Sequence, residues 1–173
     1  MLSVDCWELD YNLSLELHNA KAKSAFCLLN DTSLSDCMEA ILKNASSVLH
    51  TVQIHSLKIK YYSEKLKFQD SLGTAVCILN KIGENIDYSE SKAMSYLEAV
   101  KGSYLFHTES HHEISEFKEM EDEYKLATMA ILHDILPSLY FIKPQLYFYI
   151  SLRMVYLTLE HGVSKHSSLG LVP

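Results

Sequence analysis

The chain has 173 residues, 48% of them apolar, with 15 basic and 22 acidic residues and a formal net charge of −7. This apolar content excludes a disordered chain, and five glycines and three prolines are too few for collagen or a turn-rich β-sandwich. The excess of acidic residues argues against a general nucleic-acid binder, which needs clustered Lys and Arg, and Arg153, the single arginine, argues against a bidentate phosphate or carboxylate clamp.

Amphipathic periodicity predicts four helices in the first half of the chain, over residues 7–29, 34–45, 48–65 and 68–82. Gly83 is the expected C-cap of the fourth helix, and Ser33 or Ser35 the expected N-cap of the second. The residues expected to face the core in the first helix are Leu13, Leu17, Ala20, Ser24, Cys27 and Leu28. Those expected to face it in the next three are Cys37, Met38, Ile41, Leu42, Ala45, Val52, Leu57, Ile59, Tyr61, Tyr62, Leu72, Ala75, Val76 and Leu79.

The second half predicts a fifth helix over residues 89–106, a polar segment over 107–122, and a sixth helix over 123–136 that stops at Pro137. A seventh helix begins near Pro144 and ends at His161 and Gly162, and an aperiodic tail covers residues 163–173. Because no segment has the alternating period of a strand, we predict an all-α fold of about seven helices.

A shift of about 34 residues, the length of a tetratricopeptide repeat, superimposes apolar positions of the first four helices, for example Leu15 on Leu49 and Ile41 on Ala75. We therefore predict two tetratricopeptide-like helix hairpins over residues 1–86 and a less regular continuation of this α-solenoid fragment over 87–162. The alternative is an irregular helical bundle whose amphipathic periods coincide by chance.

Two stretches resemble a known family. The first covers residues 49–86, and the second, over 125–162, carries Leu136-Pro137, Tyr140-Phe141, Pro144 and a closing Met154-Val155-x-Leu157-x-Leu159-Glu160-x-Gly162. Together they resemble the tetratricopeptide-like segment of large multidomain signalling kinases in bacteria and fungal hybrid histidine kinases. Those proteins combine a serine/threonine-kinase-like domain, an AAA-type ATPase, this helical segment, a GAF domain and a histidine kinase.

This resemblance implies a non-catalytic module that couples neighbouring kinase and ATPase domains by protein–protein contact in two-component signalling. The chain has no phosphate-binding glycine loop and no kinase catalytic loop, so we expect no enzymatic activity and no catalytic, cofactor-binding or metal site in it. The alternative is a stand-alone helical adaptor that binds a peptide or protein. A third hypothesis is an enzyme with a cryptic site in the segment from His107 to Glu113.

A cytoplasmic location is expected, because residues 1–10 lack the basic and apolar regions of a secretory signal. We also expect no membrane span, since Pro137, Lys143, Pro144 and Arg153 interrupt the most apolar stretch. A truncated array would leave an apolar helix face uncapped at its C-terminal end, and self-association through that face is expected.

Three groups of polar residues are candidate sites. The cluster of His107, Glu109, His111, His112 and Glu113 could bind a metal ion or form a cryptic enzyme site, but a solvated loop is the favoured interpretation. His133 and Asp134 could form an acid/base pair, but adjacent helical residues point about 100° apart, which favours a surface pair. The acidic run from Glu113 to Glu123 is expected to be solvated.

The four cysteines, Cys77 included, show no CxxC spacing and are expected to be small buried residues. Sequons at Asn12, Asn30 and Asn44 carry no meaning without a signal peptide, and each asparagine could equally cap a helix or a turn. For an aromatic run, core packing with hydroxyls at its rim is the favoured interpretation, and the alternative is a face meant for a neighbouring helix or domain. The run comprises Tyr140, Phe141, Tyr147, Phe148, Tyr149 and Tyr156.

Overall fold

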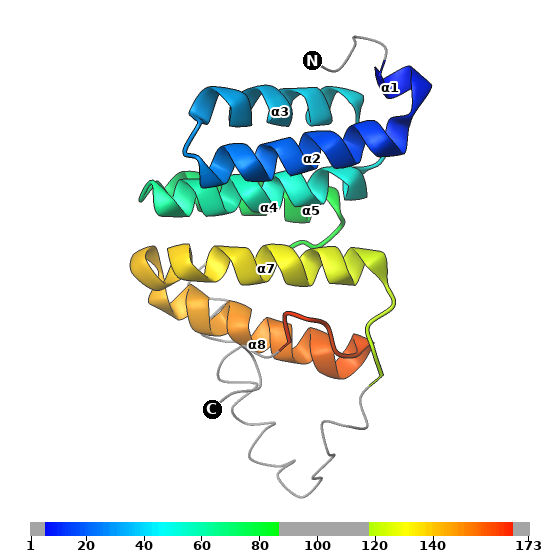
Figure 1. The fold of residues 1–173 in the computed structure, drawn as a ribbon. Helices are drawn as coiled ribbons and strands as arrows, with labels where there is room; N and C mark the ends of the chain where they lie inside the picture. The colour runs from blue at the N-terminus through cyan, green and yellow to red at the C-terminus, as the bar shows by residue number, and fades with distance from the viewer. Residues whose placement is uncertain (1–5, 87–117, 168–173) are drawn as a thin grey trace, which may run out of the picture.

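The computed structural model describes residues 6–86 and 118–167 (Figure 1). The helices are α1 (Cys6–Leu9), α2 (Tyr11–Cys27), α3 (Asp31–Asn44), α4 (Val48–Glu64), α5 (Phe68–Lys81), α7 (Glu123–Ile142) and α8 (Pro144–His161). The described residues form no strand, apart from one isolated bridge between Glu119 and Val163. The all-α prediction is thus confirmed for this part of the chain, whereas the helix predicted over 89–106 lies outside it.

The helices form three packed pairs, α2 with α3, α4 with α5 and α7 with α8, which lie in successive layers in Figure 1. The first helix of each pair also packs on the first helix of the next, α2 on α4 and α4 on α7. One apolar cluster lies between α2, α3 and α4, and includes Ala22, Cys37 and Ile41. A larger cluster joins α4, α5, α7 and α8 around side chains such as Ile78 and Leu132.

The first two hairpins repeat with a period of 37 residues. Each of the four helix boundaries in the first pair, Tyr11, Cys27, Asp31 and Asn44, has its counterpart 37 residues later in the second pair. Local contacts recur with the same period, because Nδ1 of His18 lies 2.7 Å from the carbonyl oxygen of Ser14, and Nδ1 of His55 lies 2.8 Å from that of Thr51. The predicted register of about 34 residues is therefore wrong, although a hairpin repeat is present.

Helix α2 is rotated relative to the prediction. All six residues expected to face the core, Leu13 and Leu17 among them, are exposed, and the buried face instead carries Ser14, Asn19, Ala22 and Ala25. Three of these four residues have small side chains, so the face that α2 buries is less bulky than the one that carries its leucines. Asp10 separates α1 from α2, because its side chain accepts a hydrogen bond from the backbone N–H of Leu13 and caps α2.

The other helix ends follow local capping chemistry. The N-cap of α3 is Asn30, whose side chain accepts from the N–H of Ser33, so the prediction of a serine cap is wrong and α3 begins earlier than expected. Gly83 follows α5 with a φ of 87° and confirms the predicted helix end. The ends of α2 and α4 use the same left-handed conformation with Leu29 and Leu66, at φ values of 54° and 59°.

Most predicted core residues of α3, α4 and α5 are buried or partly buried, but Leu42 is exposed. Helix α7 does not stop at Pro137 but continues to Ile142. Pro137 is exposed, so the carbonyl group left without a partner one turn earlier can face solvent, while Ser138 and Leu139 are buried. Packing of the last turn of α7 against the core therefore outweighs the local cost of the proline.

Helix α7 is, among the described residues, the one helix long and apolar enough to cross a membrane by length and composition, and 56% of its most apolar window is buried inside the protein. The core helix of a water-soluble protein passes the same test.

The start of the predicted tail packs on the protein: Ser164 and Ser167 are buried, and the Thr158 and Ser167 hydroxyls lie 2.8 Å apart. This part of the predicted tail therefore forms a turn that packs on α8, which its aperiodic sequence did not indicate.

Candidate functional site

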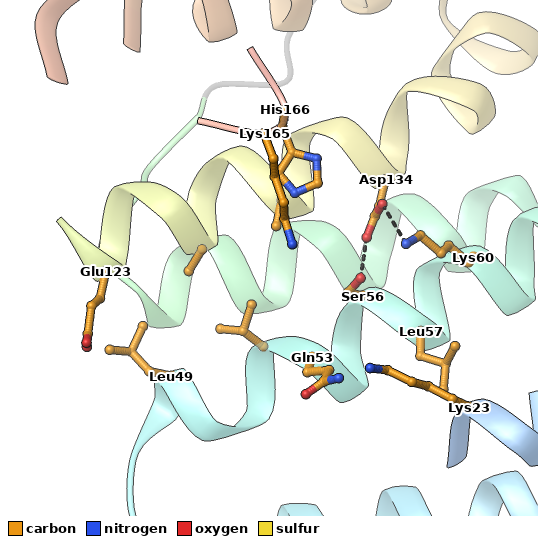
Figure 2. A pocket seen from close by; sticks show the side chains of 13 residues that line it. Lys23, Leu49, Gln53, Ser56, Leu57, Lys60, Glu123, Asp134, Lys165 and His166 are labelled. Carbon is orange, nitrogen blue, oxygen red and sulfur yellow. Dashed lines mark hydrogen bonds and ion pairs between the residues drawn. The ribbon is translucent and has the colours of Figure 1, made fainter. Parts of the chain in front are cut away.

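A hollow of about 580 Å³ lies between α4 and α7 (Figure 2). Its walls come from α2, α4, α7 and the turn that follows α8, so four segments that are distant in sequence meet there. This volume is within the ~300–1,000 Å³ range of small-ligand sites. The lining residues are Lys23, Leu49, Val52, Gln53, Ser56, Leu57, Lys60, Glu123, Ala127, Ala130, Asp134, Lys165 and His166.

Asp134 is the buried acidic group of this hollow, with 2% of its side chain exposed. Its carboxylate lies 3.0 Å from Nζ of Lys60 and 3.2 Å from Nδ1 of His133, and it accepts a hydrogen bond from the Ser56 hydroxyl. The predicted surface pair is therefore wrong for Asp134, because α4 covers this part of α7 and supplies two of the three partners. The side chains of His133 and Asp134 also contact each other, although adjacent residues on a helix point in different directions.

His166 lies beside His133, with ring centroids 4.7 Å apart. Its Nε2 atom is buried and has no hydrogen-bond partner among the described residues. Burial lowers the pKa of His166, and the nearby His133 and Lys165 lower it further. The lowered pKa favours the neutral imidazole, in which one ring nitrogen donates and the other accepts.

The buried Asp134 carboxylate holds the Ser56 hydroxyl and the Lys60 ammonium group at the edge of the hollow. Within the described residues, the hydrogen bond of the Ser56 hydroxyl goes to the Asp134 carboxylate and not to an imidazole that could take its proton. No group of three or more His, Cys, Asp or Glu side chains in residues 6–86 and 118–167 has the arrangement of a metal site. The predicted cluster of His107, Glu109, His111, His112 and Glu113 lies outside these residues.

A second buried charge, Glu84, joins the second hairpin to the third. Its carboxylate lies 2.5 Å from Nη2 and 3.2 Å from Nε of Arg153, and 3.2 Å from Nζ of Lys125. Burial alone would raise the pKa of Glu84, but the hydrogen bonds and charges of Arg153 and Lys125 outweigh it and hold that pKa below its usual range. Arg153, the single arginine of the chain, therefore helps to hold the second hairpin to the third.

The cysteines are not uniformly buried as predicted. Cys37 is buried, and burial raises the pKa of its thiol, but Cys27 and Cys77 are exposed and Cys6 is partly buried. Cys77 lies on α5 opposite the face that packs on the core, so an apolar helix does not by itself bury each small residue. Of the three sequon asparagines, Asn30 is a helix N-cap, whereas Asn12 and Asn44 belong to α2 and α3. In the described part of the acidic run, Glu119, Glu121, Asp122 and Glu123 are exposed, as expected.

The aromatic run forms a surface at the turn between α7 and α8. Tyr140, Phe141 and Phe148 are each at least 60% exposed, so core packing, the favoured interpretation, is wrong for these three. Phe141 stacks on Phe68 of α5 with ring centroids 5.0 Å apart, and Tyr147 contacts both Tyr140 and Phe148 edge to face. We call the exposed side chains of Tyr140, Phe141 and Phe148 the aromatic face.

The chain shows no significant match to protein-family models, to curated proteins or to solved structures. The sequence did not predict the hollow, because Lys23, Lys60 and Lys165 lie on segments that are distant from one another in the sequence. The signal that could have found two of them is the repeat itself, since Lys23 and Lys60 are equivalent positions at the 37-residue period.

Acidification is expected to destabilise the fold below pH 6.5, the ordinary pKa of a histidine. Burial lowers the pKa of His55, with Lys81 and Lys58 adding to it against the opposing hydrogen bond to Thr51. The unfolded chain therefore binds the proton more readily, and stability falls as the pH drops from 6.5 through the folded-state pKa. Urea unfolding at a series of pH values should show this decline, and His55→Gln should reduce its slope; an unchanged slope would contradict the assignment.

Proposed function

We propose that the protein is a non-catalytic helical interaction module that couples domains of a histidine kinase-type signalling protein through protein–protein contact in the cytoplasm. In this proposal the three hairpins form a tetratricopeptide-like array. Support for the array comes from the 37-residue repeat and from the packing of α2 on α4 and α4 on α7, because stacked hairpins share their apolar faces with neighbours. The period exceeds the usual ~34 residues of a tetratricopeptide, so the hairpins would be a longer variant.

The observation that carries the proposal is the aromatic face. Exposed aromatic side chains are enriched at the centres of protein interfaces, where they bury large areas with little loss of side-chain entropy. Tyr140, Phe141 and Phe148 project from the turn of the α7–α8 hairpin, whose position is fixed by the core beneath α7. A rigid hairpin that presents three aromatic side chains is suited to hold a neighbouring domain in one orientation.

A photo-crosslinker tests this contact. In cells that express the complete natural gene, p-benzoylphenylalanine in place of Phe141 or Phe148 should give a discrete adduct, and the same group in place of the exposed Asn80 on α5 should not. Peptides from a kinase or ATPase domain in the adduct support coupling. Peptides from an unrelated protein support the alternative, a stand-alone adaptor. Equal labelling from all three positions would contradict the proposal.

The isolated chain is expected to self-associate through the same face. We expect Phe148→Ser to weaken this association by about tenfold, because it removes an exposed aromatic anchor. Analytical ultracentrifugation over a concentration series measures the change. The matched control is Leu28→Ser, which removes an exposed apolar side chain just after α2 and should leave the association unchanged. A monomer at all concentrations would show that the aromatic face does not bind a second copy.

A further inference from the structure

We propose that the hollow between α4 and α7 binds an acidic peptide segment of a partner protein. This inference rests on the proposed interaction function and adds to it a second surface, separate from the aromatic face, with its own ligand chemistry. The hollow is lined by the first helix of each hairpin and by the turn after α8, so a ligand in it would contact all three hairpins at once. Figure 2 shows Lys165 reaching down toward α4 and Lys23 extending from α2 toward Gln53.

Two of the three lysines are available for a ligand. Lys60 is paired with the buried Asp134 at 3.0 Å, which fixes its position and neutralises it. Lys23 and Lys165 are exposed, and no carboxylate of residues 6–86 or 118–167 lies within ion-pair distance of either. In a protein with a net charge of −7, these two cations outnumber the one exposed carboxylate that lines the hollow, Glu123, and form a local positive site away from it.

The remaining lining fits a peptide with apolar side chains. Leu49 and Val52 of α4 and Ala127 and Ala130 of α7 supply apolar surface between the two helices. Gln53 is exposed beside them and can hydrogen-bond to a peptide backbone, and His166 lines the same hollow. A peptide can therefore place apolar side chains against the helices while its backbone is held by polar groups.

Charge also sets the direction of the peptide. Glu123 lines the hollow next to Leu49, at the end away from Lys60 in Figure 2, and would repel an acidic side chain. The acidic residues of the ligand are therefore expected near Lys23 and Lys165, and its apolar residues near Leu49. Lysines are point charges that suit single carboxylates. A phosphate ligand would favour an arginine fork, and Arg153, the single arginine, is engaged by Glu84.

Peptide display tests the inference with the complete chain as bait. Selection from a random library, with counter-selection against the double variant Lys23→Gln/Lys165→Gln, should enrich sequences that combine at least two acidic residues with an apolar one. The peptide most enriched is then synthesised with a fluorescent label. Fluorescence polarisation should show binding that is about tenfold weaker to the double variant and weaker in high salt.

The matched control is Lys43→Gln/Lys81→Gln, which makes the same change in net charge at two exposed lysines outside the hollow and should bind within about twofold of the wild type. Lys60 is left unchanged because it pairs with Asp134, and equal thermal midpoints confirm that both variants fold. No enrichment, enriched peptides without acidic residues, or equal binding to the double variant would each overturn the inference. None of these results affects the crosslinks from Phe141 and Phe148, which test the proposed function separately.

Discussion

Replacement of Glu84 by glutamine is expected to lower the free energy of unfolding by about 3 kcal/mol, because it removes the anionic partner of Arg153 and Lys125 at a buried position. The Glu84 side chain is 8% exposed, whereas the two cations are about a quarter exposed, which places the loss at the lower end of the range for broken buried pairs. Urea unfolding at neutral pH, followed by circular dichroism, measures the difference.

The pH dependence of this loss identifies its electrostatic origin. Because the pKa of Glu84 is lowered in the fold, its contribution to stability is present above the ordinary value of 4.5 and is lost as the pH falls through the folded-state pKa. The gap between wild type and Glu84→Gln should therefore narrow in acid. The matched control is Glu16→Gln at an exposed position of α2, with an expected change within about 0.5 kcal/mol. Equal losses in the two variants would mean that the pair with Arg153 does not stabilise the junction.

The ion pairs of Glu84 with Lys125 and Arg153 could not be predicted from the sequence. Gly83 predicts the end of α5, and the structure confirms this end. Nothing in the sequence, however, relates residue 84 to residues 125 and 153. The ion-pair partners lie 41 and 69 residues away, so they are brought together by the packing of α7 and α8 alone. A buried charge is visible in a sequence only when its partner lies within a turn or two of the same helix.

The helices themselves were largely predictable, because their periodicity and caps are local properties. Their register was not. Shifts of about 34 and 37 residues differ by three residues, close to one helical turn, so both superimpose one apolar stripe on another. The positions of the helix ends distinguish the two shifts. These ends depend on Asn30, Leu29 and Leu66, and leucine is not a residue that indicates a turn. The face of α2 was mispredicted for a related reason, since its buried residues are small or polar and its leucines face solvent.

Alanine in place of Leu139 is expected to cost about 3 kcal/mol, within the ~2–5 kcal/mol range for a buried leucine, because Leu139 is fully buried in the core shared by α4, α5, α7 and α8. The matched control is its neighbour Tyr140, which is 62% exposed, and Tyr140→Ala should cost about 1 kcal/mol or less. The contrast arises because α7 continues beyond Pro137 and turns these adjacent residues to opposite environments. Urea unfolding of both variants measures it. If the helix ended at Leu136, as the proline suggested, Leu139 would lie in a connection, and the two substitutions would cost similar amounts.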